Sequence, residues 1–88
     1  MKLLFEESFL KDLKKINDRA LRHKVFEIIK HLKTINTISE IRNIKKLHNK
    51  KNYFRIRLGN YRIGLEIIGD TIIFVRILHR KDIYKYFP

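Results

Sequence analysis

Three arginines near the middle of the chain are spaced so that they could hold one phosphate. Arg55, Arg57 and Arg62 flank the dipeptide Gly59-Asn60, which is typical of a two-residue β-hairpin turn. Such a turn places Arg57 directly opposite Arg62, with Arg55 on the same face. Like charges that face each other across a strand pair are destabilising, whereas a phosphate can accept hydrogen bonds from several guanidinium groups. The pattern predicts a phosphate-binding face; the alternative is that the long side chains extend separately into water.

The C-terminal segment adds groups that the cleavage of RNA requires. RNA carries its own nucleophile in the 2′-OH, so an enzyme needs a base for that proton, cations for the phosphate and an acid for the leaving oxygen. His79 or a lysine is the predicted base. Arg80 joins Arg57 and Arg62 as the predicted phosphate clamp. Tyr84 or a cation is the predicted proton donor, and Tyr84 could also be a stacking platform for a base.

The place of His79 depends on the register of the last two predicted strands. Gly69-Asp70 is a second turn signal between them. If this turn also has two residues, simple alternation places His79 on the face that carries Arg57 and Arg62. The face to which a side chain points is weakly determined at the end of a strand, so Arg80 could turn to this face as well.

The arginines lie within a one-sided basic stretch. Between Glu40 and Glu66 there is no acidic residue, and the whole chain has a net charge of +12 on 88 residues. Such a charge indicates a polyanionic partner: nucleic acid, an acidic protein or an anionic membrane surface. Interleaved tyrosines offer surfaces on which bases can stack. The predicted RNA-binding residues are Lys45, Lys46, Lys50, Lys51, Tyr53, Arg55, Arg57 and Tyr61.

The composition argues against several other kinds of site. The absence of cysteine excludes disulfides, cysteine-ligated zinc and thiol nucleophiles. The four histidines show no metal-ligand spacing, and no close acidic pair suggests a Mg²⁺ site. We therefore expect neither a metal nor a cofactor. With no signal-peptide core and no membrane-length apolar run, a cytoplasmic protein without a membrane partner is expected.

Changes in hydrophobic period predict the elements that position these groups. The order β-α-α-β-β-β predicts a single α+β domain, 1–88, with a helical hairpin packed on one face of a mainly antiparallel four-stranded sheet. Residues 34–44 lack a clear period and are predicted to form a loop that could hold a turn of helix. The predicted elements are a strand at 2–5, a helix capped by Ser8, a helix capped by Asn17-Asp18 that ends near 33, strands at 53–58, 61–68 and 71–78, and a tail from His79 that could hold one helical turn.

The segments from Tyr53 to Ile63 and from Val75 to Tyr84 resemble the RelE/ParE toxins, and the similarity extends over nearly the whole chain. The resemblance implies a microbial-RNase-like RelE fold and metal-independent endoribonuclease activity on mRNA in the ribosomal A site. It also implies an acidic RelB-like antitoxin and binding of operator DNA only as the toxin–antitoxin complex.

Carried over by position, the functional residues of the family fall on Arg62, Arg80 and Tyr84, and a basic pair falls on Arg55 and Arg57. The best-known relative has lysines at that pair, one with a base role. Because arginine loses its proton far less readily than lysine, we expect both arginines only to bind phosphate, which favours His79 as the base.

Two other functions are compatible with this pattern. A ParE-like toxin on the same fold would inhibit DNA gyrase by binding protein, and such relatives generally lack the clustered catalytic set. The high positive charge alone would also suit a non-catalytic, basic nucleic-acid-binding module.

Overall fold

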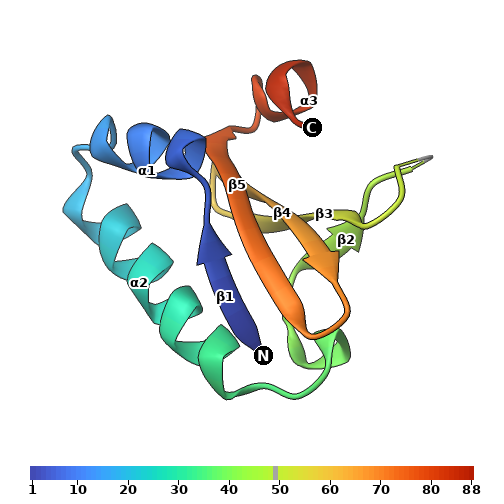
Figure 1. Ribbon diagram of the computed structural model, residues 1–88. Coiled ribbons are helices and arrows are strands. Elements are labelled where there is room, and N and C mark those ends of the chain that lie inside the picture. Colours follow the sequence, from blue (N-terminus) through green and yellow to red (C-terminus); the bar gives the residue numbers. More distant parts are fainter. Residues whose placement is uncertain (49) are drawn as a thin grey trace.

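The computed structural model describes residues 1–48 and 50–88 of the chain. Helices α1 and α2 lie together beside a twisted sheet, and α3 lies beyond the end of β5 (Figure 1). The sheet has five strands in the order β1-β5-β4-β3-β2, all antiparallel except the parallel pair β1–β5. The elements are β1 (Lys2–Phe5), α1 (Glu7–Lys14), α2 (Arg19–Thr34), a short 3₁₀ helix (Ile38–Glu40), β2 (Ile44–Lys46), β3 (Tyr53–Leu58), β4 (Tyr61–Ile68), β5 (Thr71–His79) and α3 (Ile83–Tyr86).

The α+β class and the order of the helices are confirmed, but the prediction of a four-stranded sheet is wrong. The additional strand is β2, which pairs antiparallel with β3 through Ile44–Ile56, Lys45–Arg55 and Lys46–Phe54. Three residues are too few to show an alternating pattern, and β2 exists only because the edge of β3 is available to pair with it.

The register predicted for the first hairpin is confirmed. Leu58 pairs with Tyr61, Arg57 with Arg62 and Ile56 with Ile63 around a two-residue turn. Gly59 has a φ of +59°, a backbone conformation in which glycine meets no steric penalty. The sheet therefore carries Arg57 and Arg62 on one face and the buried Ile56 and Ile63 on the other.

The second hairpin contains an irregularity that simple alternation does not predict. Leu65 pairs with Phe74, but the preceding Gly64 pairs with Arg76, so that Val75 is an extra residue in β5. One such β-bulge exchanges the faces of all later residues in the strand. This exchange decides where His79 lies.

The main core fills the space between α1, α2 and the sheet face that carries Ile56 and Ile63. Leu21, Val25 and Leu32 give α2 its buried stripe. Asp18 caps α2, since its side chain accepts a hydrogen bond from the Leu21 N–H at 3.1 Å, as predicted. We call the side of the sheet that α1 and α2 do not cover, which carries Arg57 and Arg62, the open face.

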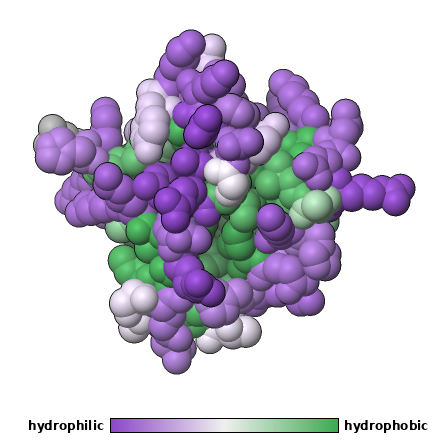
Figure 2. Space-filling model, turned by 180° about the vertical axis from the view of Figure 1, so that it is seen from behind, coloured by the Kyte–Doolittle hydropathy of each residue, from purple (hydrophilic) through white to green (hydrophobic). Residues whose placement is uncertain are grey.

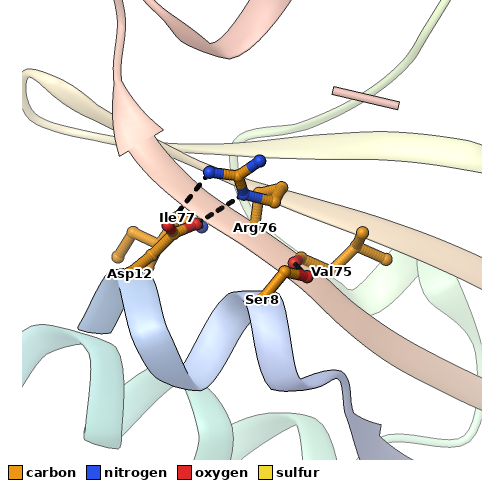
Figure 3. Close-up of polar contacts among 5 residues, drawn as sticks. All are labelled: Ser8, Asp12, Val75, Arg76 and Ile77. Atoms are coloured by element: carbon orange, nitrogen blue, oxygen red, sulfur yellow. Dashed lines mark hydrogen bonds and ion pairs between the residues drawn. The ribbon is translucent and has the colours of Figure 1, made fainter. Parts of the chain in front are cut away.

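Helix α1 lies along the edge of β5 where β1 has ended (Figure 3). The Ser8 hydroxyl donates to the Val75 carbonyl at 2.6 Å, and the Asp12 carboxylate accepts from the Ile77 N–H at 3.1 Å. The prediction that Ser8 caps this helix is wrong: Glu6 holds the N-cap position, and Ser8 is helical. Residues one helical turn apart thus provide hydrogen bonds to β5 in place of a neighbouring strand.

Within the part of the chain that the structure describes, no helix combines the length and the apolarity needed to span a membrane.

Candidate active site

The arginine group on the open face is centred on Arg62. Its guanidinium donates to the Gly59 carbonyl at 2.7 Å and to the Tyr61 carbonyl at 2.9 Å, which fixes its head at the β3–β4 turn. Partial burial lowers the pKa of Arg62, and the charges of Arg55, Arg57 and Arg80 lower it further. The positive form of Arg62 is therefore disfavoured by its surroundings, although an arginine stays charged at neutral pH.

Asn43, in the residues that precede β2, fixes the other two arginines of the group. Its backbone carbonyl accepts from the Arg57 N–H at 3.0 Å and from an Arg55 guanidinium nitrogen at 3.1 Å. The Arg57 guanidinium also lies 3.4 Å from the Asn43 side-chain oxygen. Asn43 has a φ of +62°, a conformation that asparagine tolerates better than most residues. The left-handed turn at Asn43 thus aims a carbonyl at both arginines.

Arg80 and Tyr84 approach the same group from the C-terminal tail. The Arg80 N–H donates to the Asn60 carbonyl at 2.7 Å, which ties the end of β5 to the β3–β4 turn. Both residues act on the pKa of Arg62, Arg80 by lowering it and Tyr84 by opposing that shift. Tyr84 is 63% exposed and remains accessible to a ligand. The structure therefore brings together Arg55, Arg57, Arg62, Arg80 and Tyr84, which we call the arginine cluster.

The predicted lysines are divided between the faces of the sheet. Lys45 pairs with Arg55 and lies on the open face, whereas Lys46 pairs with Phe54 and lies on the opposite face. Lys50 and Lys51 are exposed and border a shallow depression in the β2–β3 loop. Only Lys45 is therefore placed by its strand on the same face as the arginine cluster.

The structure does not bring His79 or Tyr61 to the arginine cluster. After the bulge at Val75, His79 pairs with Tyr61 on the face that carries the buried Ile63 and Ile77. The two rings meet edge to face at 5.6 Å, and His79 Nδ1 accepts from the Lys81 N–H at 3.2 Å. The prediction that His79 lies beside Arg57 and Arg62 is wrong, because one extra residue in β5 turns His79 to the opposite face of the sheet.

Tyr53 lies on the open face, but it packs against the tail. Its ring meets Phe87 edge to face with centroids 5.6 Å apart, and the residue is only partly exposed. Phe87 is buried at 3% exposure, so that the tail is held to the domain. Tyr53 therefore supports the tail and retains limited surface for stacking.

Sequence patterns missed two residues that shape this region, Asn43 and Asp12. Nothing in the loop composition marks Asn43 except the tolerance of asparagine for positive φ. Asp12 is buried at 7% exposure and binds the Arg76 guanidinium at 2.7 and 3.0 Å (Figure 3). The sequence signal for this pair is Arg76 itself, a charged residue in an otherwise apolar strand. Among residues 1–48 and 50–88, no group of His, Cys, Asp and Glu is clustered as a metal site would require.

A groove between α2 and β3 lies next to the arginine cluster. Its floor is apolar and its rim carries several cations, and Arg57 lines both the groove and the open face. Seen from behind, the molecule shows apolar surface surrounded by hydrophilic side chains (Figure 2). The groove is lined by Lys24, Glu27, Ile28, His31, Leu32, Ile41, Arg42, Asn43, Ile56, Arg57 and Leu58.

Comparisons with known proteins agree on one family. The family model described as the ParE toxin of the type II toxin–antitoxin system parDE matches residues 3–84. Toxin RelE3 from Methanocaldococcus jannaschii is 49% identical to the chain over 89 residues, with 100% of both covered. Putative toxin RelE1 from the same organism is 34% identical over 74 residues, which cover 83% of this chain and 81% of the relative.

The same relationship holds for solved structures. A chain in the crystal structure of the RelB-RelE antitoxin-toxin complex from Methanococcus jannaschii superposes with a TM-score of 0.84 at 48% identity, covering 97% of this chain and 99% of that one. The archaeal RelE-RelB complex from Pyrococcus horikoshii has a similar chain, with a TM-score of 0.72, 19% identity, and coverage of 90% and 93%. At this lower identity the match supports the fold alone.

Proposed function

The chain belongs to the RelE/ParE family of toxins of type II toxin–antitoxin systems, and on this premise we propose that it is an endoribonuclease. Its substrate would be mRNA, cleaved in the ribosomal A site without a metal cofactor. The observation that carries the proposal is the arginine cluster. In it, the charges of Arg55, Arg57 and Arg80 all act on an Arg62 that is fixed by two backbone carbonyls.

The cluster suits the charge that develops when the 2′-oxygen attacks a phosphate. The five-coordinate phosphorane formed by this attack carries more negative charge on its oxygens than the ground-state phosphodiester, and fixed cations stabilise that increase. Burial lowers the pKa of Arg62 most, and a bound phosphate would relieve the repulsion from neighbouring arginines that lowers it further. Arg62 and Arg80 are therefore proposed to contact the scissile phosphate, with Arg55 and Arg57 binding the neighbouring backbone.

Proton transfer is assigned to groups that share this face. Tyr84 is exposed and influences the pKa of Arg62, and its hydroxyl could donate a proton to the leaving 5′-oxygen. Lys45 is the lysine that a strand places on the open face, and it replaces His79 as the proposed base because His79 lies on the other face. The pH–rate profile of the Lys45→Arg variant tests this assignment. We expect its ascending limb, which reports loss of the base's proton, to be displaced to higher pH with a lower rate at neutral pH, because arginine loses its proton far less readily than lysine.

The test of the proposal is cleavage of mRNA programmed on ribosomes, followed by mapping of the 5′ ends of the products. We expect cuts confined to the codon in the A site and absent when an A-site tRNA blocks access. Intact mRNA after incubation with folded protein would contradict the endoribonuclease assignment. It would favour a non-catalytic nucleic-acid-binding module if the protein still bound RNA.

We further propose that a RelB-like antitoxin neutralises the chain by occupying the groove between α2 and β3. The toxin chain at 48% identity was solved as a RelB-RelE complex. The groove offers an apolar floor that includes Ile28 and Ile41, and the cations Lys24 and Arg42 on its rim, which suit an acidic amphipathic segment. Because Arg57 borders both surfaces, an acidic segment there would reach the arginine cluster.

This partner proposal is tested by titrating the neighbouring reading frame's product, if it is short and acidic, against toxin variants. We expect Ile28→Arg to weaken binding, whereas Phe26→Ala, at an exposed residue of α2 outside the groove lining, should leave it unchanged. Affinity should fall as salt is raised, since the rim charges are exposed. A complex indifferent to both changes would contradict the groove as the docking site.

A second function deserves a direct test because the matching family model is that of the ParE toxins. A ParE-like chain would inhibit DNA gyrase and leave mRNA intact. Supercoiling assays with purified gyrase separate the two functions: inhibition of supercoiling together with uncut ribosomal mRNA would favour gyrase.

A further inference from the structure

A second apolar cluster lies on the open face of the sheet, separate from the main core. Its buried members are Leu47, Ile83 and Phe87. Tyr53, Val75 and Leu78 of the strands pack against them. The cluster thus attaches the C-terminal tail and the start of the β2–β3 loop to the face that carries the arginines.

Phe87 lies directly on Gly64 at the centre of this cluster. A Cβ on Gly64 would be 2.7 Å from each of three carbon atoms of the Phe87 ring, a distance at which something must shift. Gly59 and Gly69 instead have positive φ and open space around them. Gly64 is therefore required by the close approach of the Phe87 ring, and not by backbone conformation.

The same contact lies at the end of the helical turn that carries Tyr84. Ile83 and Phe87 are both buried, and the Phe87 N–H donates to the Ile83 carbonyl at 2.9 Å, which closes one helical turn between them. With its two ends held against the sheet, the turn leaves Tyr84 63% exposed, where its charge acts on the pKa of Arg62. The Asp82 N–H, bonded to the His79 carbonyl at 2.8 Å, fixes the start of the turn.

We propose that Gly64 and Phe87 are positioning residues that hold Tyr84 in place at the arginine cluster. A four-residue helix is too short to be stable by itself, so its place depends on packing. The role of Tyr84 in catalysis rests on the proposed endoribonuclease function, but its position can be measured independently. Loss of the Phe87 ring should free the tail while the main core, which contains neither residue, stays folded.

The structural test measures the backbone order of the tail by ¹⁵N heteronuclear NOE and the rate of trypsin cleavage after Lys85. We expect Phe87→Ala to lower the NOE of the Tyr84 amide to that of a free terminus and to speed cleavage, and Phe87→Leu to restore much of the order. Val25→Ala is the matched control, because it removes buried volume from α2 in the main core. A Tyr84 amide that stays as ordered in Phe87→Ala as in the wild type would overturn the proposal.

Gly64→Ala provides a second variant, which acts from the other side of the contact. We expect the added methyl group to displace the ring and free the tail as Phe87→Ala does. In the double variant Gly64→Ala with Phe87→Val, the smaller side chain leaves room for the methyl group, and tail order should partly return. A tail as ordered in Gly64→Ala as in the wild type would count against the contact.

The functional test asks whether Phe87 acts through Tyr84. We expect Phe87→Ala to lower the turnover rate on ribosome-bound mRNA about 10- to 100-fold with little change in KM, because a displaced group loses its alignment. In a Tyr84→Phe background the same substitution should add almost nothing. Multiplicative effects of the two substitutions would overturn the positioning role. If the wild type cleaves no mRNA, the proposed function fails, and the NOE and proteolysis results still decide the structural claim.

Discussion

Arg76 and the arginine cluster show two opposite uses of arginine within one sheet. Arg76 reaches the edge of β5, where its Nε and a terminal nitrogen donate to Asp12 at 2.7 and 3.0 Å. The hydrogen bond to Asp12 raises the pKa of Arg76. Arg62, by contrast, is bound by neutral carbonyls, and burial together with neighbouring arginines lowers its pKa. One guanidinium is satisfied within the chain, and the other is surrounded by uncompensated charge.

This difference separates structural from functional charge. Arg76 forms an ion pair with Asp12, whereas among the described residues no ion pair joins Arg55, Arg57, Arg62 or Arg80 to a carboxylate. Arg55 Nε is buried without a hydrogen-bond partner among those residues. Buried polar atoms without a partner are rare in folded proteins because they destabilise the fold. The sheet therefore tolerates repulsion on the open face while it neutralises the charge at the β5 edge.

The largest expected effect comes from removing charge from the arginine cluster. We expect Arg62→Ala with Arg80→Ala to lower the rate of mRNA cleavage at least about 10²- to 10³-fold, because fixed cations would no longer stabilise the transition state. Stability should change little. Single-turnover cleavage on ribosomes measures the rate, with Arg19→Ala, at an exposed position of α2, as the control for lost positive charge. If the double variant cleaved mRNA at the wild-type rate, the arginine cluster would have no role in catalysis.

The next effect concerns the structural pair. Asp12→Ala should lower the free energy of unfolding by about 3 kcal/mol, because it leaves a partly buried Arg76 charge and the Ile77 N–H without their acceptor. Urea denaturation measures the change. Glu7→Ala on the same helix, which breaks an exposed pair with Lys11, should cost less than about 0.5 kcal/mol. A similar loss of unfolding free energy in both variants would show that the buried Asp12–Arg76 pair stabilises the fold no more than an exposed pair does.

A smaller effect of opposite sign is expected within the arginine cluster. Arg57→Thr should raise the free energy of unfolding by about 0.2–1 kcal/mol, because it removes a positive charge directly opposite Arg62. The gain should shrink as salt is added, since screening already weakens the repulsion in the wild type. Urea denaturation at low and high salt measures both. A destabilised variant would mean that the contacts of Arg57 with Asn43 outweigh the repulsion.

The smallest effect concerns a carboxylate whose partners are backbone groups. The Asn36 and Thr37 N–H groups donate to Glu40 at 2.9 and 3.0 Å and lower its pKa below 4.5. The stabilisation is therefore present above about pH 4.5, the unfolded value, and is lost as the pH falls through the lower folded pKa. Thermal unfolding of Glu40→Gln should match the wild type in acid and fall slightly below it at neutral pH. A difference in melting temperature between the variant and the wild type that grows as the pH is lowered would contradict this prediction.

The sequence by itself determined the first hairpin and what it carries. Gly59-Asn60 fixes a two-residue turn, and strict alternation then fixes the pairing of Arg57 with Arg62 and the burial of Ile56 and Ile63. The α2 cap at Asp18 follows from local chemistry in the same way. These features depend on residues close in the chain, where turn geometry and hydrophobic period suffice.

Only the tertiary structure decided features that depend on distant contacts. The bulge at Val75 reverses the face of His79, and α1 supplies Asp12 to that same edge of β5 from 64 residues away. Strand β2 forms only against β3, and the place of Tyr84 depends on Phe87 meeting Gly64. Local pattern cannot contain this information, because each outcome is a balance between elements that meet only when the chain has folded.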